Sequence, residues 1–217
     1  MMRWLVMLLP VCAWAQSDPW KNVYTESAWK ERDAWQKPAE LIRHLRIGAG
    51  SVVADVGSHE GYLTFKLAAA VGTAGKVYAV DVEQHKLDRL KQHAAERNVE
   101  NIQTVKGDYD NPRLPLSQLD AVAILDTYHE MDDHDAILQH IKQSLKKGGR
   151  LVICEPIAAE RRQASRAAQE AKHELGMAYA VADLKRAGFR IVTQQDPFVD
   201  RSQVKGDVMW LVVAEKD

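Results

Sequence analysis

The sequence has few of the features that mark specialised classes of protein. Only two of its 217 residues are cysteine, which excludes a disulfide-rich scaffold and a four-cysteine zinc site. Lys and Arg total 29 against 30 Asp and Glu, so the charge gives no reason to expect nucleic acid as a partner. The one strongly apolar run, residues 4–13, is too short to span a bilayer, so no stable membrane anchor is expected. What remains is an ordinary globular chain, of a length that suits one α/β domain.

The first fifteen residues have the three parts of a signal peptide. Arg3 precedes an apolar stretch, and Ala13-Trp14-Ala15 has the small-x-small pattern that a signal peptidase needs. We therefore predict cleavage after Ala15 and a periplasmic or secreted protein. A lipoprotein signal at Cys12 is disfavoured by the bulky Val11 before it. The alternative is a cytosolic protein that has an apolar start by chance.

Residues 16–36 form a polar arm with an unusual density of aromatic side chains. These are Trp20, Tyr24, Trp29 and Trp35. We expect the arm to be partly helical, with its rings packed on the domain or placed as a lid over a pocket. The remaining residues, 37–217, are predicted to form the main domain.

From residue 38 onward, apolar strands alternate with helices. Strands are predicted at 51–56, 76–82, 102–105, 119–125, 150–154, 189–193 and 208–214. Helices are predicted to begin at Pro38 and to cover 61–71, 84–97, 133–145 and 160–187, the last in at least two pieces broken near Gly176. Because the strands are apolar throughout, both faces of the sheet must be covered. The fold class is therefore α/β, with a doubly wound, mostly parallel, seven-stranded sheet.

Ligands of such a sheet bind beyond the carboxyl ends of its strands, and four of these ends carry polar residues. The first is Asp55-Val56-Gly57-Ser58-His59-Glu60-Gly61-Tyr62, where glycines allow a sharp turn and bring backbone N–H groups close to a ligand. Asp81 ends the second strand, where a carboxylate can accept hydrogen bonds from a ribose diol. Gly107-Asp108-Tyr109 is placed to meet an adenine edge, and Asp126-Thr127-Tyr128-His129-Glu130 follows the fourth strand.

Together these segments resemble the class I S-adenosylmethionine-dependent methyltransferases, over residues 35–217. The resemblance implies S-adenosylmethionine as the cofactor, a Rossmann-like sheet with an antiparallel C-terminal strand, and a small-molecule acceptor. It also implies which residues hold the cofactor. The loop of Asp55, Gly57, Ser58, His59 and Gly61 would lie near the methionine part, Asp81 at the ribose, and Asp108 with Tyr109 at the adenine.

His59 stands where most members of the family have a third glycine. The spacing of Gly57, Gly61 and Tyr62 fits the G-x-x-x-G-Y variant of the catechol and caffeoyl-coenzyme A O-methyltransferases. His59 would narrow the pocket, or contact the cofactor carboxylate or the substrate. An NAD-dependent dehydrogenase is disfavoured, because its fingerprint needs the second glycine that this loop lacks.

The residues after the fourth strand are the candidates for the chemical step. His129 is the predicted general base, since an ordinary pKa of about 6.5 leaves a neutral imidazole at pH 7. Tyr128 would form a wall against the methyl group. Asp126 would act beside them, or hold a hard cation with Glu155, although we expect a mechanism that needs no metal. The alternative for Tyr128 and His129 is plain packing between the sheet and a helix.

A second function class remains open at this stage. The cofactor is made in the cytosol, which conflicts with an exported enzyme. A module that binds a nucleoside or cofactor on the same fold, without turnover, is therefore the alternative to an enzyme.

Overall fold

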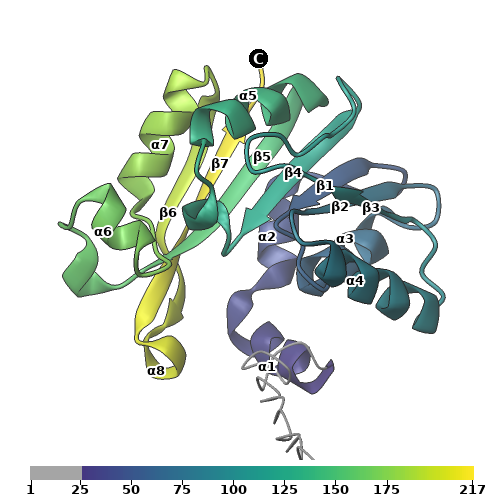
Figure 1. Cartoon of the computed structure of the whole chain (residues 1–217), viewed down its shortest axis with the longest axis horizontal. Coiled ribbons are helices and arrows are strands. Elements are labelled where there is room, and N and C mark those ends of the chain that lie inside the picture. The colour runs from purple at the N-terminus through teal and green to yellow at the C-terminus, as the bar shows by residue number, and fades with distance from the viewer. Residues whose placement is uncertain (1–25) are drawn as a thin grey trace, which may run out of the picture.

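The computed structural model describes residues 26–217, which form a seven-stranded sheet with helices on both faces (Figure 1). The strands are β1 (Val52–Val56), β2 (Lys76–Asp81), β3 (Ile102–Lys106), β4 (Leu119–Leu125), β5 (Leu145–Ile157), β6 (Arg190–Arg201) and β7 (Asp207–Glu215). Their order is β3-β2-β1-β4-β5-β7-β6. β1 to β5 pair in parallel, whereas β7 is antiparallel to both of its neighbours. The predicted fold class is confirmed, including the antiparallel C-terminal strand.

The helices divide between the two faces. They are α1 (Glu26–Gln36), α2 (Pro38–Leu45), α3 (Tyr62–Val71), α4 (Gln84–Glu96), α5 (His134–Ser144), α6 (Arg166–Glu170), α7 (Met177–Arg186) and α8 (Ser202–Lys205), with 3-10 turns η1 (Tyr128–Glu130) and η2 (Ala159–Arg161). One apolar core lies between the sheet and α1 to α3, and the other lies between the sheet and α5 with α7. None of the described helices combines the length and the apolar character needed to cross a bilayer.

Strand β4 shows why the central strands are apolar without alternation. Its side chains point in turn to the two cores, Ala121 and Ala123 to one and Val122 and Ile124 to the other. All four are buried, because helices cover both faces. Cys154 of β5 is also fully buried, and burial raises the pKa of its thiol well above the ordinary value, which keeps it in the unreactive thiol form.

The helix predicted over 133–145 is confirmed as α5, but the strand predicted to begin at residue 150 begins earlier. α5 begins after Asp133, which caps it by accepting the N–H of Ala136 at 2.9 Å, and it ends at Ser144. β5 begins at once with Leu145, which pairs with Leu119 before the register shifts. Gly148 and Gly149 allow this irregularity, since Gly148 has a φ of +74°. The N–H of Gly148 donates to the carbonyl of Lys216, whose own N–H donates to the carbonyl of Gly149.

The carboxyl ends of the parallel strands lie at the lower edge of the sheet as drawn in Figure 1, and α1 and α8 lie below this edge. Two arginines connect these helices to the end of β4. Nη2 of Arg32, in α1, lies 3.8 Å from Oδ2 of Asp126. Nη1 of Arg201, just before α8, lies 3.5 Å from the same oxygen. The predicted signal peptide, Trp20 and Tyr24 lie outside the described residues.

Candidate functional site

The glycine loop joins β1 to α3 at the ligand edge of the sheet. Gly57 has a φ of +81° and Gly61 a φ of +106°, a region that favours glycine. A Cβ atom at Gly57 would also collide with the side chain of Thr127, which follows β4. The loop is therefore fixed against the neighbouring strand end as well as turned by its glycines.

Two side chains of this loop lie inside the fold. Asp55 is buried and accepts a hydrogen bond from the Thr64 hydroxyl at 2.6 Å, and its burial raises the pKa of its carboxyl to about 6. It thus joins β1 to α3 from within. The Ser58 hydroxyl is also buried but has no hydrogen-bond partner among the described residues. A buried donor without a partner is costly, so Ser58 is suited to a ligand that supplies an acceptor.

His59 occupies a left-handed conformation, with a φ of 48°. Its Nδ1 accepts the N–H of Glu60 at 2.9 Å. Burial, together with the nearby Lys86 ammonium, lowers the pKa of its imidazole to about 3, so the ring is neutral at pH 7. The loop therefore accommodates a histidine in the place of the third glycine without placing a charge there.

Asp81 lies at the end of β2 and is nearly buried. Its Oδ2 accepts the backbone N–H of His59 and its Oδ1 that of Glu83, both at 2.9 Å. Each carboxylate oxygen has a second acceptor site, so the carboxylate can still receive the two hydroxyls of a ribose. The strand-end acid and the glycine loop therefore form one bonded unit.

The predicted adenine contacts lie further out. Asp108 is half exposed and forms a two-pronged ion pair with Arg113, at 2.7 and 3.0 Å. Tyr109 is 65% exposed, so its ring lies mostly in solvent. The backbone N–H of Gly107 donates to the carbonyl of Asp81, which keeps this segment beside β2. The adenine contact stays a prediction.

The aromatic arm both packs and borders the ligand edge. Trp29 is buried against Phe65 and His93, with ring centroids 5.7 and 5.8 Å apart. Trp35 lies under the guanidinium groups of Arg32 and Arg201, at 5.8 and 5.6 Å. Packing on the domain thus describes Trp29, whereas Trp35 lies beside the two arginines that contact the end of β4.

Asp126 lies between these two arginines. Burial opposes its ionisation, but the charges of Arg201 and Arg32 outweigh this effect and hold the pKa of its carboxyl below the ordinary value. Glu155, by contrast, turns toward η1 and accepts the backbone N–H groups of Thr127 at 2.6 Å and Tyr128 at 2.9 Å. The two carboxylates therefore have different partners, arginine side chains for Asp126 and backbone N–H groups for Glu155.

Tyr128 lies in the core, in the packed position that was the alternative to contact with the methyl group. Its side chain is fully buried and its hydroxyl donates to Asp183 at 3.0 Å. The ring packs edge-on against His134, with centroids 4.5 Å apart.

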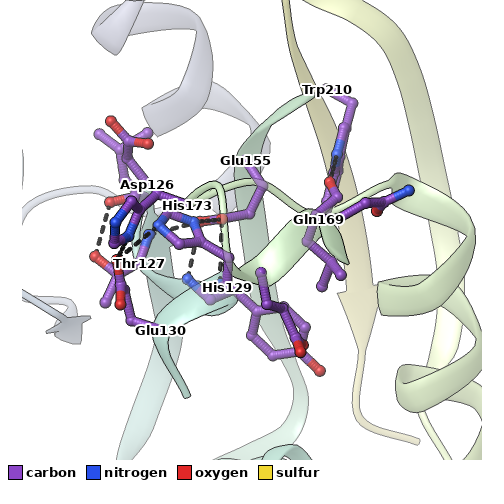
Figure 2. A network of polar contacts seen from close by, with 12 residues as sticks. Asp126, Thr127, His129, Glu130, Glu155, Gln169, His173 and Trp210 are labelled. Carbon is purple, nitrogen blue, oxygen red and sulfur yellow. Dashed lines mark hydrogen bonds and ion pairs between the residues drawn. The ribbon is translucent and has the colours of Figure 1, made fainter. Parts of the chain in front are cut away.

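His129 is held by carboxylates on both sides (Figure 2). Its Nδ1 lies 2.5 Å from Oε2 of Glu155, and its Nε2 lies 3.1 Å from Oε1 of Glu130. Burial opposes a positive charge here, but the ion pair with Glu155 outweighs it and raises the pKa of the imidazole to about 9. The expectation of a neutral imidazole at pH 7 is therefore corrected. In this state His129 is a cation that must lose a proton before it can act as a base.

Sequence reasoning missed several partners of these residues. Arg32, Thr64, His173 and Arg201 all contact predicted site residues or their neighbours, and Glu155 was considered only as a cation ligand. These residues come from segments with no motif, and only the fold brings them to the site.

Comparisons with known proteins agree with this geometry. Residues 47–204 match the family described as "Methyltransferase domain". A demethylmenaquinone methyltransferase of Anoxybacillus flavithermus is 25% identical over 64% of this chain and 58% of its own length. An uncharacterized methyltransferase of a Geobacillus species is 26% identical over 78% of both chains. The chain spans less than two thirds of the length of that demethylmenaquinone methyltransferase.

Two solved structures share the fold. A SAM-dependent methyltransferase from Aquifex aeolicus matches with a TM-score of 0.73 and 21% identity, over 89% of this chain and all of the other. The geranyl diphosphate C-methyltransferase from Streptomyces coelicolor matches with a TM-score of 0.71 and 14% identity, over 96% of this chain and 90% of the other.

Proposed function

The chain belongs to the class I S-adenosylmethionine-dependent methyltransferases, and from this premise we propose that it transfers a methyl group to a small-molecule acceptor. The observation that carries the proposal is the hydrogen bond between the glycine loop and Asp81, which the backbone N–H of His59 donates. An acid in this position, with unused acceptor sites beside a turn rich in N–H groups, suits a nucleoside with a charged tail.

The described residues fit the cofactor. The Ser58 hydroxyl lies buried in the loop that would face the methionine part, and no hydrogen-bond partner for it is found within residues 26–217. Asp81 would hold the ribose, and the backbone N–H groups of the loop would contact the tail. When bound, S-adenosylmethionine supplies a methyl group that its sulfonium already activates. The protein then needs mainly to position the acceptor and to exclude water.

The acceptor proposed here is small and polar. Two of the similar proteins are named for small acceptors, demethylmenaquinone and geranyl diphosphate. In this chain a cavity of about 560 Å³ adjoins η1 and the start of α5, a volume in the range of sites for small molecules. Its lining includes His129, Glu130, His134, Arg166 and Glu170, so charged and polar groups dominate it.

The residues around η1 would prepare this site. Glu155 fixes the backbone of η1 and the ring of His129. Once His129 has lost its proton, the imidazole is a base within reach of an acceptor in the adjoining cavity. An acceptor that carries no proton at the reacting atom would need no base, and the protein would only have to position it.

Calorimetry and a turnover assay test the proposal together. In calorimetry the chain should bind S-adenosylmethionine and its demethylated product. In the turnover assay it should convert S-adenosylmethionine to that product when small acceptors are supplied, from a panel that includes quinols and isoprenoid diphosphates. The proposed cofactor site would be contradicted if the chain bound neither of these two ligands, or if it bound NAD in their place. Binding without turnover on any acceptor would favour the alternative function, a non-catalytic binding module.

A further inference from the structure

Three potential metal ligands from two distant segments meet beside the cavity. His129 and Glu130 belong to η1, and His173 belongs to the turn after α6. One ligand atom of each lies within 4.8 Å of the other two. Figure 2 shows these three side chains converging, with Glu155 beside His129.

The contacts within the cluster centre on one carboxylate oxygen. Oε1 of Glu130 lies 3.1 Å from Nε2 of His129 and 2.5 Å from Nδ1 of His173. The two imidazole rings meet edge-on, with centroids 6.0 Å apart. Both rings therefore direct a nitrogen toward the same point, which is the arrangement that a metal ion with two imidazole ligands requires.

Glu155 supplies the second layer of such a site. It is fully buried, and its Oε2 lies 2.5 Å from Nδ1 of His129. A metal-bound histidine usually donates its other N–H to a carboxylate, which fixes the tautomer and the orientation of the ring. In His129 this bond leaves Nε2, the atom that faces Glu130, as the nitrogen for a metal.

We propose that His129, Glu130 and His173 bind one divalent transition-metal ion of the zinc class. Two imidazoles and one carboxylate suit zinc, cobalt(II) or nickel(II), whereas magnesium and calcium prefer oxygen ligands alone. Three protein ligands leave a fourth position open, and Glu130 and His173 are both exposed, so that position is accessible to water or a small molecule.

The proposal goes beyond methyl transfer and does not depend on it. A metal ion on Nε2 of His129 would take the lone pair that a general base needs, so the imidazole could act as a base only in the metal-free chain. It also replaces the metal-free expectation from the sequence with a site made from different residues than the Asp126 and Glu155 pair considered there. No motif in the sequence marks His173 as a ligand, and only the turn after α6, where its φ is +57°, brings it to η1.

Cobalt(II) is the probe for the test, because its visible absorption reports nitrogen ligands and tetrahedral geometry. The full chain, prepared without a polyhistidine tag and treated with chelator, should bind one equivalent of cobalt, which zinc displaces. His173→Ala and Glu130→Gln change exposed side chains and so should leave the circular dichroism spectrum unchanged. Each should weaken cobalt binding by about a hundredfold or more. The loss of a metal ligand lowers the affinity at least as much as the loss of a residue that hydrogen-bonds to a ligand.

His85→Ala is the matched control, because it removes an exposed histidine on α4 outside the cluster. Its cobalt affinity should equal that of the parent. Three outcomes would overturn the proposal: no cobalt bound by the parent, which would leave the cluster as an ion pair only; equal affinity in His173→Ala; or displacement of cobalt by an equal concentration of magnesium.

Glu155→Gln adds a test of the second layer. It keeps the shape of the side chain but removes the charge that holds Nδ1 of His129, so cobalt affinity should fall by about tenfold to a hundredfold. If this buried substitution unfolds the chain, the two exposed variants still decide the question.

Discussion

The backbone N–H of His59 donates a hydrogen bond to Oδ2 of Asp81 at 2.9 Å, which joins the glycine loop to the end of the neighbouring strand. Asp81 thus orders the loop and, with its remaining acceptor sites, is available to a ribose. A substitution there is expected to affect both the loop and the ligand, so the two effects must be measured separately.

Asp81→Ala should weaken the binding of the demethylated cofactor by about tenfold to a hundredfold, because two ligand hydroxyls lose their acceptor. Calorimetry measures the affinity, and thermal unfolding without ligand measures the effect on the loop. Asp88→Ala, on the exposed face of α4, is the control and should bind like the parent. An unchanged affinity in Asp81→Ala would show that the ribose is held elsewhere.

His59→Gly should bind the cofactor at least as tightly as the parent. The backbone N–H that Asp81 accepts is retained, and glycine adopts the observed φ of 48° without the cost of about 1 kcal/mol that another residue bears. Calorimetry again gives the affinity. A loss of tenfold or more would instead make the imidazole a direct contact of the ligand.

The sheet could be predicted because each of its strands is a local signal. β4 has the predicted bounds, 119–125, since an apolar run between polar segments needs no knowledge of distant residues. The site was harder to predict than the sheet. The strand-end acids and the glycine loop follow from the fold class, but the partners of His129 lie 26 residues away at Glu155 and, through Glu130, at His173. Such contacts depend on the packing of η1 and the turn after α6, which no periodicity encodes.

The prediction of a neutral His129 failed for the same reason. An isolated histidine has a pKa near 6.5; burial lowers this value in His129, and the neighbouring carboxylates, Glu155 foremost, raise it by more. The sequence pattern placed His129 at the end of a strand correctly, yet it contained no information about which strand would supply the partner.

Tyr128→Phe should lower the free energy of unfolding by about 1 kcal/mol, the usual effect of removing one buried hydrogen bond. Asp183 keeps its ion pair with Arg166 at 2.9 Å, so its charge is not left alone. Urea unfolding measures the change. Tyr109→Phe is the control, because that ring is exposed, and it should be neutral. Equal stabilities in both variants would contradict a structural contribution from the Tyr128 hydroxyl.

The export prediction can be tested by mass spectrometry. Expressed from Met1 in a Gram-negative host, the chain should be recovered outside the cytosol with Gln16 as its first residue. Ala15→Arg should block cleavage, since a large charged side chain does not fit the peptidase pocket. A cytosolic chain that retains residues 1–15 would contradict the prediction.

The last prediction concerns the charge of His129 and follows from its ion pair with Glu155. The pKa of the imidazole is about 9 in the folded chain and about 6.5 in the unfolded chain, so the folded state binds the proton more tightly. The resulting stabilisation is fully present below about pH 6.5 and is lost as the pH rises through about 9. The free energy of unfolding should therefore fall over this range, by as much as about 3 kcal/mol.

Urea unfolding at several pH values between 6 and 9.5, for the parent and for His129→Gln, measures this effect. The variant is less stable throughout, because it leaves Glu155 without its charged partner, but its free energy should change less over the same range. The slope, rather than the absolute stability, therefore reports the proton. An NMR titration identifies the group directly, because the imidazole resonance with a midpoint near pH 9 should be missing from His129→Gln. Parallel stability curves, or a histidine midpoint near 6.5 at this position, would show that Glu155 does not hold the proton on His129.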